Sequence, residues 1–195
     1  GILAGKKVVV VRSGIGKVNA GICAQILADV FSVDAIINTG IAGSLNKNIN
    51  IGDIVLSTDV LHHDMDAIGF GYKKGQIPQM EAFSFHSDDA LRKLAVQACK
   101  EVNPDIEVFE GRIASGDQFV ADQGVKDFVV KEFGAYAVEM EGAAIAQVAY
   151  QFSVPFLIIR AMSDVGDEDA GQSFDEFIIE AGKKSANMIL NFLKK

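Results

Sequence analysis

The sequence predicts a three-layer α/β domain in which a central, twisted, mixed β-sheet is flanked by helices. Strand-like apolar runs alternate with helix-like segments along the chain, as they do in βαβ units. Hydrophobic residues make up 49% of the chain and charged residues 23%, which is typical of a globular protein with ample core. The length of 195 residues suits one domain better than two, so we expect a single domain over 1–195.

The first half of the chain begins with a β-branched run. The sequence VVVV at 8–11 is apolar on both faces, which is typical of a buried parallel strand. A helix should follow, because apolar residues recur at a four-residue spacing: Val18, Ile22, Ile26 and Val30. The next strand, 34–38, should end in the Gly-rich turn TGIAGS at 39–44, and a further strand should cover 53–57.

The second half continues the alternation up to a final helix. We expect further elements in this order: helix 88–102, a strand that runs into a Gly-Asp turn within 107–119, helix 125–133, strand 136–138, helix 139–152 and strand 155–162. The last helix should begin at a capping box formed by Ser173 and Glu176. The polar stretch 62–79 is long for a loop in a compact domain, which predicts a functional or interface element.

Charge and cysteine usage exclude several classes of protein. A net charge of −8 and a pI of about 4.8 argue against nucleic acid, because phosphate backbones need clustered Lys and Arg. Cys23 and Cys99 lie in apolar helical contexts without CxxC spacing, which is typical of free thiols in a reducing compartment. No apolar run approaches the ~18 residues that span a bilayer and no signal-peptide pattern is present, so we expect a cytoplasmic protein without a membrane partner.

The sequence does not match three known binding motifs that parts of it resemble. SGIGK at 13–17 lacks the four-residue spacer of a phosphate-binding loop, and Val18 stands where its Ser or Thr should be. The same stretch fails the dinucleotide fingerprint GxGxxG, because Asn19 replaces the last Gly. HHDMD at 62–66 has metal-ligand residue types, but they crowd one loop rather than rigid elements, so we predict no metal site.

Carboxylates follow two of the predicted strands. In VEMEG at 138–142, Glu139 and Glu141 are two residues apart where a strand meets a helix, so they point the same way if the backbone is extended. Such a carboxylate can accept hydrogen bonds from a pair of sugar hydroxyls, although acids are also common at helix N-termini for the sake of the helix dipole. Ser163 and Asp164 come directly after a buried strand, and partial burial would equip Asp164 as a general acid.

Five motifs, in this order, resemble the 5′-methylthioadenosine/S-adenosylhomocysteine nucleosidases of the nucleoside phosphorylase superfamily. They are INTGIAG (37–43), GDIVLS (52–57), SGDQF (115–119), VEMEGAAIA (138–146) and RAMSDVGDEDAGQSFDEF (160–177). The resemblance runs essentially from end to end. It implies a nucleoside phosphorylase-like fold and hydrolysis of the N-glycosidic bond, which releases adenine and a thio-substituted ribose.

The resemblance also implies the catalytic residues. The general acid that protonates adenine N7 falls on Asp164, and Ser163 orients it. The carboxylate that holds the ribose hydroxyls falls on Glu141, and Met140 packs under the sugar.

The resemblance also implies which residues line the substrate pocket. Phe119 would stack on adenine, and the backbone of Val120 would read the edge of the base. Ile15 and Phe174 would line the alkylthio pocket, with Phe85 from the partner subunit of a homodimer. Ala42 and Gly43 in the Gly-rich turn would approach the base and the sugar. Glu139 and Arg160 are further candidate substrate-binding residues, because they neighbour Glu141 and Asp164 in the sequence. No cofactor and no metal are implied, and the ligand is an adenine thionucleoside.

The sequence departs from the family in two places. The family's water-activating Glu lies in a Met-Glu-Glu-type motif after its first strand, and this sequence does not contain that motif. We therefore expect a domain without the family's first strand, and little activity if that strand is truly absent. Ile41 stands where many members carry Ser.

Two other functions stay open alongside hydrolysis. A phosphorylase needs a cation before the Gly-rich turn, and INTG at 37–40 supplies none, although Arg12 and Arg160 lie elsewhere on strand ends. A nucleoside-binding protein without chemistry is consistent with the missing Glu motif. A general purine-nucleoside hydrolase would accept inosine, whereas the apolar pocket around Ile15 and Phe174 predicts a preference for a thioether.

Overall fold

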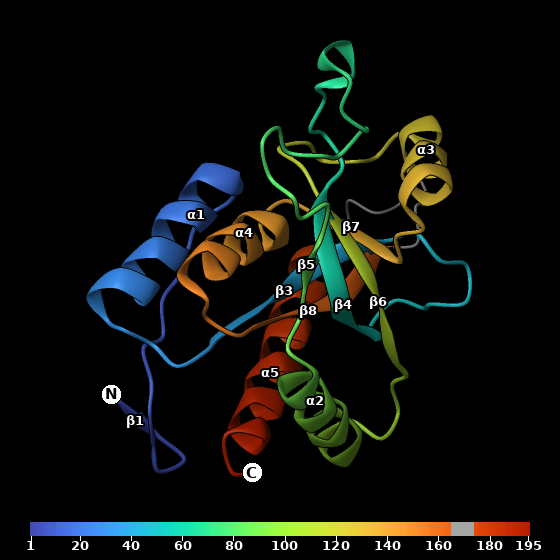
Figure 1. The fold of residues 1–195 in the computed structure, drawn as a ribbon. Coiled ribbons are helices and arrows are strands. Elements are labelled where there is room, and N and C mark those ends of the chain that lie inside the picture. The colour runs from blue at the N-terminus through green and yellow to red at the C-terminus, as the bar shows by residue number, and fades with distance from the viewer. Residues whose placement is uncertain (165–173) are drawn as a thin grey trace.

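The structure is a computed structural model that describes the backbone of residues 1–164 and 174–195, and side chains apart from those of 164, 174–178 and 180. A six-stranded sheet with the order β5-β4-β6-β7-β3-β8 forms its centre (Figure 1). The strands are β3 (Ile36–Ser44), β4 (Ile54–His62), β5 (Phe85–His86), β6 (Val108–Ser115), β7 (Ala137–Glu139) and β8 (Phe156–Asp164). None of the described helices is long and apolar enough to cross a membrane.

The sheet is mixed and curls back on itself. The pairs β3–β8, β4–β6 and β6–β7 are parallel, whereas β3–β7, β4–β5 and β4–β8 are antiparallel. Because β4 pairs with β6 along one edge and with β8 along the other, the strands between them close into a ring. The predicted twisted, mixed sheet is confirmed.

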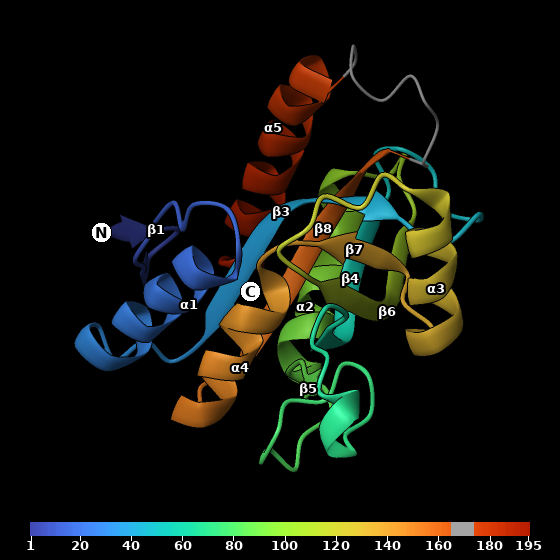
Figure 2. The ribbon, with the colours of Figure 1, turned by 90° about the horizontal axis from the view of Figure 1, so that it is seen from above.

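Helices cover both faces of this sheet, as the turned view in Figure 2 shows. The helices α1 (Lys17–Gln25) and α4 (Gly142–Phe152) share one core cluster with the sheet, and α2 (Asp89–Val102) and α5 (Phe174–Phe192) share another. The helix α3 (Gln123–Phe133) packs in a third, smaller cluster, in which its Val129 and Phe133 meet Leu61 of β4. The three-layer α/β fold is confirmed.

Local signals explain where several of these helices begin. The carboxylate of Asp88 accepts a hydrogen bond from the backbone N–H of Leu91 at 2.8 Å and so caps α2. Asp122 caps α3 in the same way through Val125, at 2.9 Å. Small side chains let α4 pack closely, since its buried positions are mostly Gly and Ala. The capping box predicted at Ser173 and Glu176 lies outside the described residues.

The prediction of a buried strand at 8–11 is wrong. In the described chain this run has no partner in the six-stranded sheet, and it follows a small hairpin of β1 (Ile2–Leu3) and β2 (Lys6–Lys7). Val10 is 82% exposed. A β-branched run favours extended backbone, but a strand also needs a neighbour to accept its hydrogen bonds.

One further expectation needs correction, and one confirmed helix has an unexpected orientation. The motif TGIAGS at 39–44 is not a turn, because β3 continues through it as far as Ser44. The helix predicted from the four-residue spacing is present as α1, which buries Ala20 and Ala24 against α4 and leaves the apolar stripe outside. The stripe is exposed: Val18 71%, Ile22 55%, Ile26 45% and Val30 70%, the last two in the π-helical turn η1 (Ile26–Val30).

The long polar segment after β4 projects from the body of the molecule, at the top of Figure 1. Its central feature is a single 3₁₀ turn, η2 (Ile68–Phe70). The segment is tied down near its base, where the N–H of Gly75 donates to the carbonyl of Met65 at 2.9 Å.

Candidate active site

The register of β3 brings two candidate segments together. Gly43 lies opposite Val138 of β7 on one side and opposite Asp164 of β8 on the other. The strand ends that carry Glu139 and Ser163 are therefore neighbours of the same Gly-rich segment. Ligands in α/β sheets bind at such strand ends, and Glu139, Gly43 and Ser163 share this edge.

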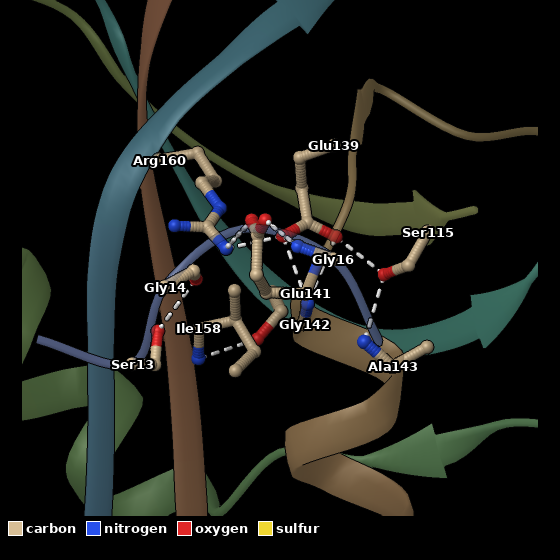
Figure 3. A network of polar contacts seen from close by, with 11 residues as sticks. Ser13, Gly14, Gly16, Ser115, Glu139, Glu141, Gly142, Ala143, Ile158 and Arg160 are labelled. Atoms are coloured by element: carbon tan, nitrogen blue, oxygen red, sulfur yellow. Dashed lines mark hydrogen bonds and ion pairs between the residues drawn. The ribbon is translucent and has the colours of Figure 1, made fainter. Parts of the chain in front are cut away.

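Glu139 is the centre of a buried polar network (Figure 3). Its carboxylate accepts hydrogen bonds from the hydroxyl of Ser115 and from the N–H of Gly142, the latter at 2.8 and 3.0 Å to its two oxygens. The N–H of Glu141 adds a further bond at 3.0 Å. Burial opposes ionisation, but the charge of Arg160 together with these hydrogen bonds holds the pKa of Glu139 below its usual range. Glu139 therefore stays anionic and fixes the start of α4.

Arg160 supplies the opposite charge from the neighbouring strand. Its side chain is buried and pairs with Glu139, and its Nη2 lies 3.5 Å from Oε2 of Glu141. The guanidinium lies over Gly40 of β3, where an added Cβ would overlap Nη1 and lie 3.2 Å from Cζ. Gly40 is therefore required by the close approach of this cation to the strand.

Glu141 lies at the N-terminus of α4, where β7 has ended. One carboxylate oxygen accepts a hydrogen bond from the N–H of Gly16 at 2.9 Å. Burial raises the pKa of Glu141, and this N–H only partly offsets burial and the repulsion from Glu139. Figure 3 shows Glu141 and Arg160 pointing toward one another beside the backbone that enters α1.

The other polar candidates lie along the same edge. The hydroxyl of Ser163 donates to the carbonyl of Ala42 at 3.3 Å, and both residues are buried. The register of the β3–β8 pair shifts between Ala42 and Gly43. The backbone of Asp164 ends β8, but its side chain and that of Phe174 lie outside the described residues.

The apolar candidates are more exposed than the polar ones. Ile15 is 72% exposed and Phe119 is 71% exposed, so both offer surface to a ligand or a neighbouring subunit. Met140 is half-buried, whereas the side chain of Val120 is buried.

Phe85 does not fit the role expected of it. Its side chain is only 1% exposed and packs in the core of its own chain, 5.5 Å from the ring of Tyr150. It therefore offers no surface to a second subunit. Sequence reasoning missed Phe70, which is 87% exposed on the projecting segment. The available signal was an aromatic residue between Gly69 and Gly71 in a long polar loop.

Residues of the HHDMD segment (62–66) are buried or bonded to other side chains of the same chain. His62 and His63 are buried, and burial lowers the pKa of both imidazoles. The Nε2 of His62 lies 3.0 Å from Oε1 of Gln147. Asp64 pairs with Lys17 at 2.8 Å. Among the residues that the structure describes, no group of three or more His, Cys, Asp and Glu is arranged to hold a metal ion.

The fold and this edge of carboxylates define the class of protein. A sequence profile of the Phosphorylase superfamily matches residues 1–194, so the chain belongs to that superfamily.

Individual relatives indicate which family within this superfamily the chain resembles. The 5′-methylthioadenosine/S-adenosylhomocysteine nucleosidase of Bacillus licheniformis is 45% identical across the whole of this chain, which covers 84% of that relative. The structure of the Neisseria meningitidis enzyme of the same name, in complex with methylthio-immucillin-A, is also 45% identical, with a TM-score of 0.93 over 100% of this chain and 84% of that one. The futalosine hydrolase of Helicobacter pylori is 37% identical, with a TM-score of 0.91 over 99% and 82%. The chain is a member of the 5′-methylthioadenosine/S-adenosylhomocysteine nucleosidase family and an N-glycosidic hydrolase.

Proposed function

We propose that this protein hydrolyses the N-glycosidic bond of 5′-methylthioadenosine and S-adenosylhomocysteine in the cytoplasm, releasing adenine and a thio-substituted ribose. The main support is the register of β3, which brings the segment of Glu141 and the end of β8 to one edge. Relatives at 43–45% identity carry the matching name. The two free cysteines are in keeping with a reducing compartment.

Glu141 holds the sugar in this proposal. One of its oxygens already accepts the N–H of Gly16, and a carboxylate has lone pairs to spare for two ribose hydroxyls. Breaking the C–N bond develops positive, oxocarbenium-like charge on the sugar, which a nearby anion stabilises. Because the pKa of Glu141 is raised, this anion forms at a higher pH than that of an ordinary glutamate, and the reaction should gain rate as the pH rises through that pKa.

Asp164 is the proposed general acid at adenine N7. Protonation there relieves the negative charge that the leaving base develops, and it restricts the reaction to purines. Its place at the end of a buried strand, directly after the buried Ser163, supports this role. Ser163 is the proposed positioning residue for this carboxyl group.

Phosphorolysis is disfavoured by the charge balance around Arg160. A phosphorylase must hold a phosphate dianion, which needs an uncompensated cation near the Gly-rich strand. Arg160 is the buried cation against Gly40, but Glu139 and Glu141 already flank it. A phosphate would therefore meet two carboxylates as well as the guanidinium.

The protein also forms a homodimer in this proposal. The exposed stripe of Val18, Ile22 and Val30 is an apolar helix face of the kind that marks an interface. Ile15 continues the stripe toward the site. The exposed Phe70 takes the place expected of Phe85 and covers the thio-substituent from the partner subunit.

Adenine release from methylthioadenosine in phosphate-free buffer tests the function. We expect release by wild-type protein that carries the family's first strand, and a rate at least about 100-fold lower when Asp164→Asn is made in it, because general acid catalysis contributes that much or more. Asp88→Asn is the matched control, since Asn also caps helices and this Asp lies at the start of α2. Wild-type protein that binds methylthioadenosine without releasing adenine would be a binding protein, and the proposal would be wrong.

A further inference from the structure

Three charged residues that the proposed chemistry does not use meet beside the start of α1. The Nζ of Lys17 lies 2.8 Å from each carboxylate oxygen of Asp64. The backbone N–H of Asp117 donates to Asp64 at 3.0 Å, and the backbone N–H of Lys17 donates to Oδ1 of Asp117 at 2.7 Å. We call Lys17, Asp64 and Asp117 the clamp.

The clamp joins three segments that are far apart in the sequence. Lys17 begins α1, Asp64 follows β4 at the base of the projecting segment, and Asp117 follows β6. Each segment carries an exposed apolar side chain a few residues away: Ile15, Phe70 and Phe119. The Lys17 and Asp64 side chains are 22% and 25% exposed, so their attraction is less screened than that of a fully exposed pair.

The start of α1 depends on carboxylates from elsewhere. Gly16 stands at the N-cap position and has no side chain to satisfy the first N–H groups of the helix. Glu141 accepts the N–H of Gly16, and Asp117 accepts the next one, from Lys17. Any movement of the first turn of α1 therefore changes the partner of the carboxylate that holds the ribose.

The remaining contacts of this helix lie along its length. Its buried positions are Ala20 and Ala24, which pack against α4, and the side chain of Asn19 donates to the carbonyl of Ile15 at 2.7 Å. Gly16 has φ +88°, and a Cβ there would lie 3.0 Å from Oδ1 of Asp117. The backbone geometry is thus matched to the position of Asp117.

We propose that the clamp is a positioning device for Glu141. It holds the first turn of α1 so that the N–H of Gly16 fixes the carboxylate that binds the ribose hydroxyls. Lys17 and Asp64 are positioning residues and touch no substrate. This inference rests on the proposed function, because it assigns a role within that site.

Kinetics of a double-mutant cycle test the clamp. We expect Lys17→Met to lower kcat/KM for methylthioadenosine by about tenfold, mainly through KM, because a misplaced binding group weakens substrate binding. Asp64→Asn should act in the same direction. In a Glu141→Gln background the effect of Lys17→Met should shrink to less than about twofold, since residues that act through one another are not additive.

Lys195→Met is the matched control. Lys195 pairs with Glu101 at 2.8 Å and its side chain is 19% exposed, close to the values for Lys17, but the pair joins the C-terminus to α2. We expect wild-type kinetics from this variant.

The kinetic results distinguish a failure of the clamp hypothesis from a failure of the proposed function. If the wild type is active and Lys17→Met leaves KM unchanged, or has the same effect with and without Glu141, the clamp does not position Glu141. If Lys17→Met fails to fold, Asp64→Asn carries the same test. A wild type that releases no adenine would overturn the proposed function, and this role of the clamp with it.

Discussion

Gly40 offers the sharpest test of how the buried charges are arranged. Replacing it with Ala adds one methyl group, which would overlap Nη1 of Arg160. Arg160 is 2% exposed and its guanidinium pairs with Glu139, so it has little room to move without leaving that carboxylate. The substitution therefore acts on the network through a residue that carries no charge.

The expected loss follows from the buried ion pair. Removing one partner of such a pair destabilises a protein by about 3–5 kcal/mol, because a charge is left buried without compensation. Arg160 is displaced here rather than removed, so we expect the lower end, about 3 kcal/mol. Each kcal/mol lowers the midpoint of thermal unfolding by about 2–4 °C at this size, which predicts a fall of about 6–12 °C.

Thermal and urea unfolding of Gly40→Ala measure this loss. Gly69→Ala is the control, because a Cβ at Gly69 meets no other atom within 4 Å and its φ is not positive. The control should stay within about 1 kcal/mol of the wild type. If Gly40→Ala were as stable as Gly69→Ala, the close packing of Arg160 against β3 would be refuted.

Three other results are expected. Burial lowers the pKa of both His62 and His63 in the folded protein, so the unfolded chain binds protons at these residues more readily. The free energy of unfolding should therefore fall as the pH drops below about 6.5. Urea titrations at several pH values should show a weaker dependence in His63→Gln than in His86→Gln, and equal dependence would contradict the role of burial. Asp88→Ala should lose about 1 kcal/mol in the same assay through its lost cap on α2, whereas an unchanged midpoint would count against that cap. Ile22→Glu should be a monomer by light scattering if the exposed α1 stripe is the dimer interface, and a stable dimer would exclude that surface.

The sequence predicted most of the elements because local signals agreed with the tertiary packing. The strand 155–162 became β8, and the helix 88–102 became α2 with its cap at Asp88. The run at 8–11 failed because β-propensity describes a residue's fit to a sheet and does not supply a neighbouring strand. The stripe on α1 was read correctly as helical, but periodicity does not tell which apolar face is the buried one.

The candidate site was predictable for a different reason. Carboxylates at strand ends are visible in the sequence, and the sheet then brings Glu139 and Glu141 beside Arg160. The clamp was not predictable, because it depends on the meeting of Lys17 and Asp64 across 47 positions. The resemblance implied Phe85 as a partner contact, but a family resemblance does not tell which side chains are buried, and Phe85 is only 1% exposed.

In the proposed reaction the sugar is transferred from adenine to water and not to phosphate. The most direct measurement is the mass of the sugar product after methylthioadenosine is incubated with the protein in ¹⁸O-water that also contains phosphate. Hydrolysis should give free methylthioribose with one ¹⁸O atom at C1. Methylthioribose 1-phosphate would contradict it, and so would a reaction mixture in which methylthioadenosine remains intact.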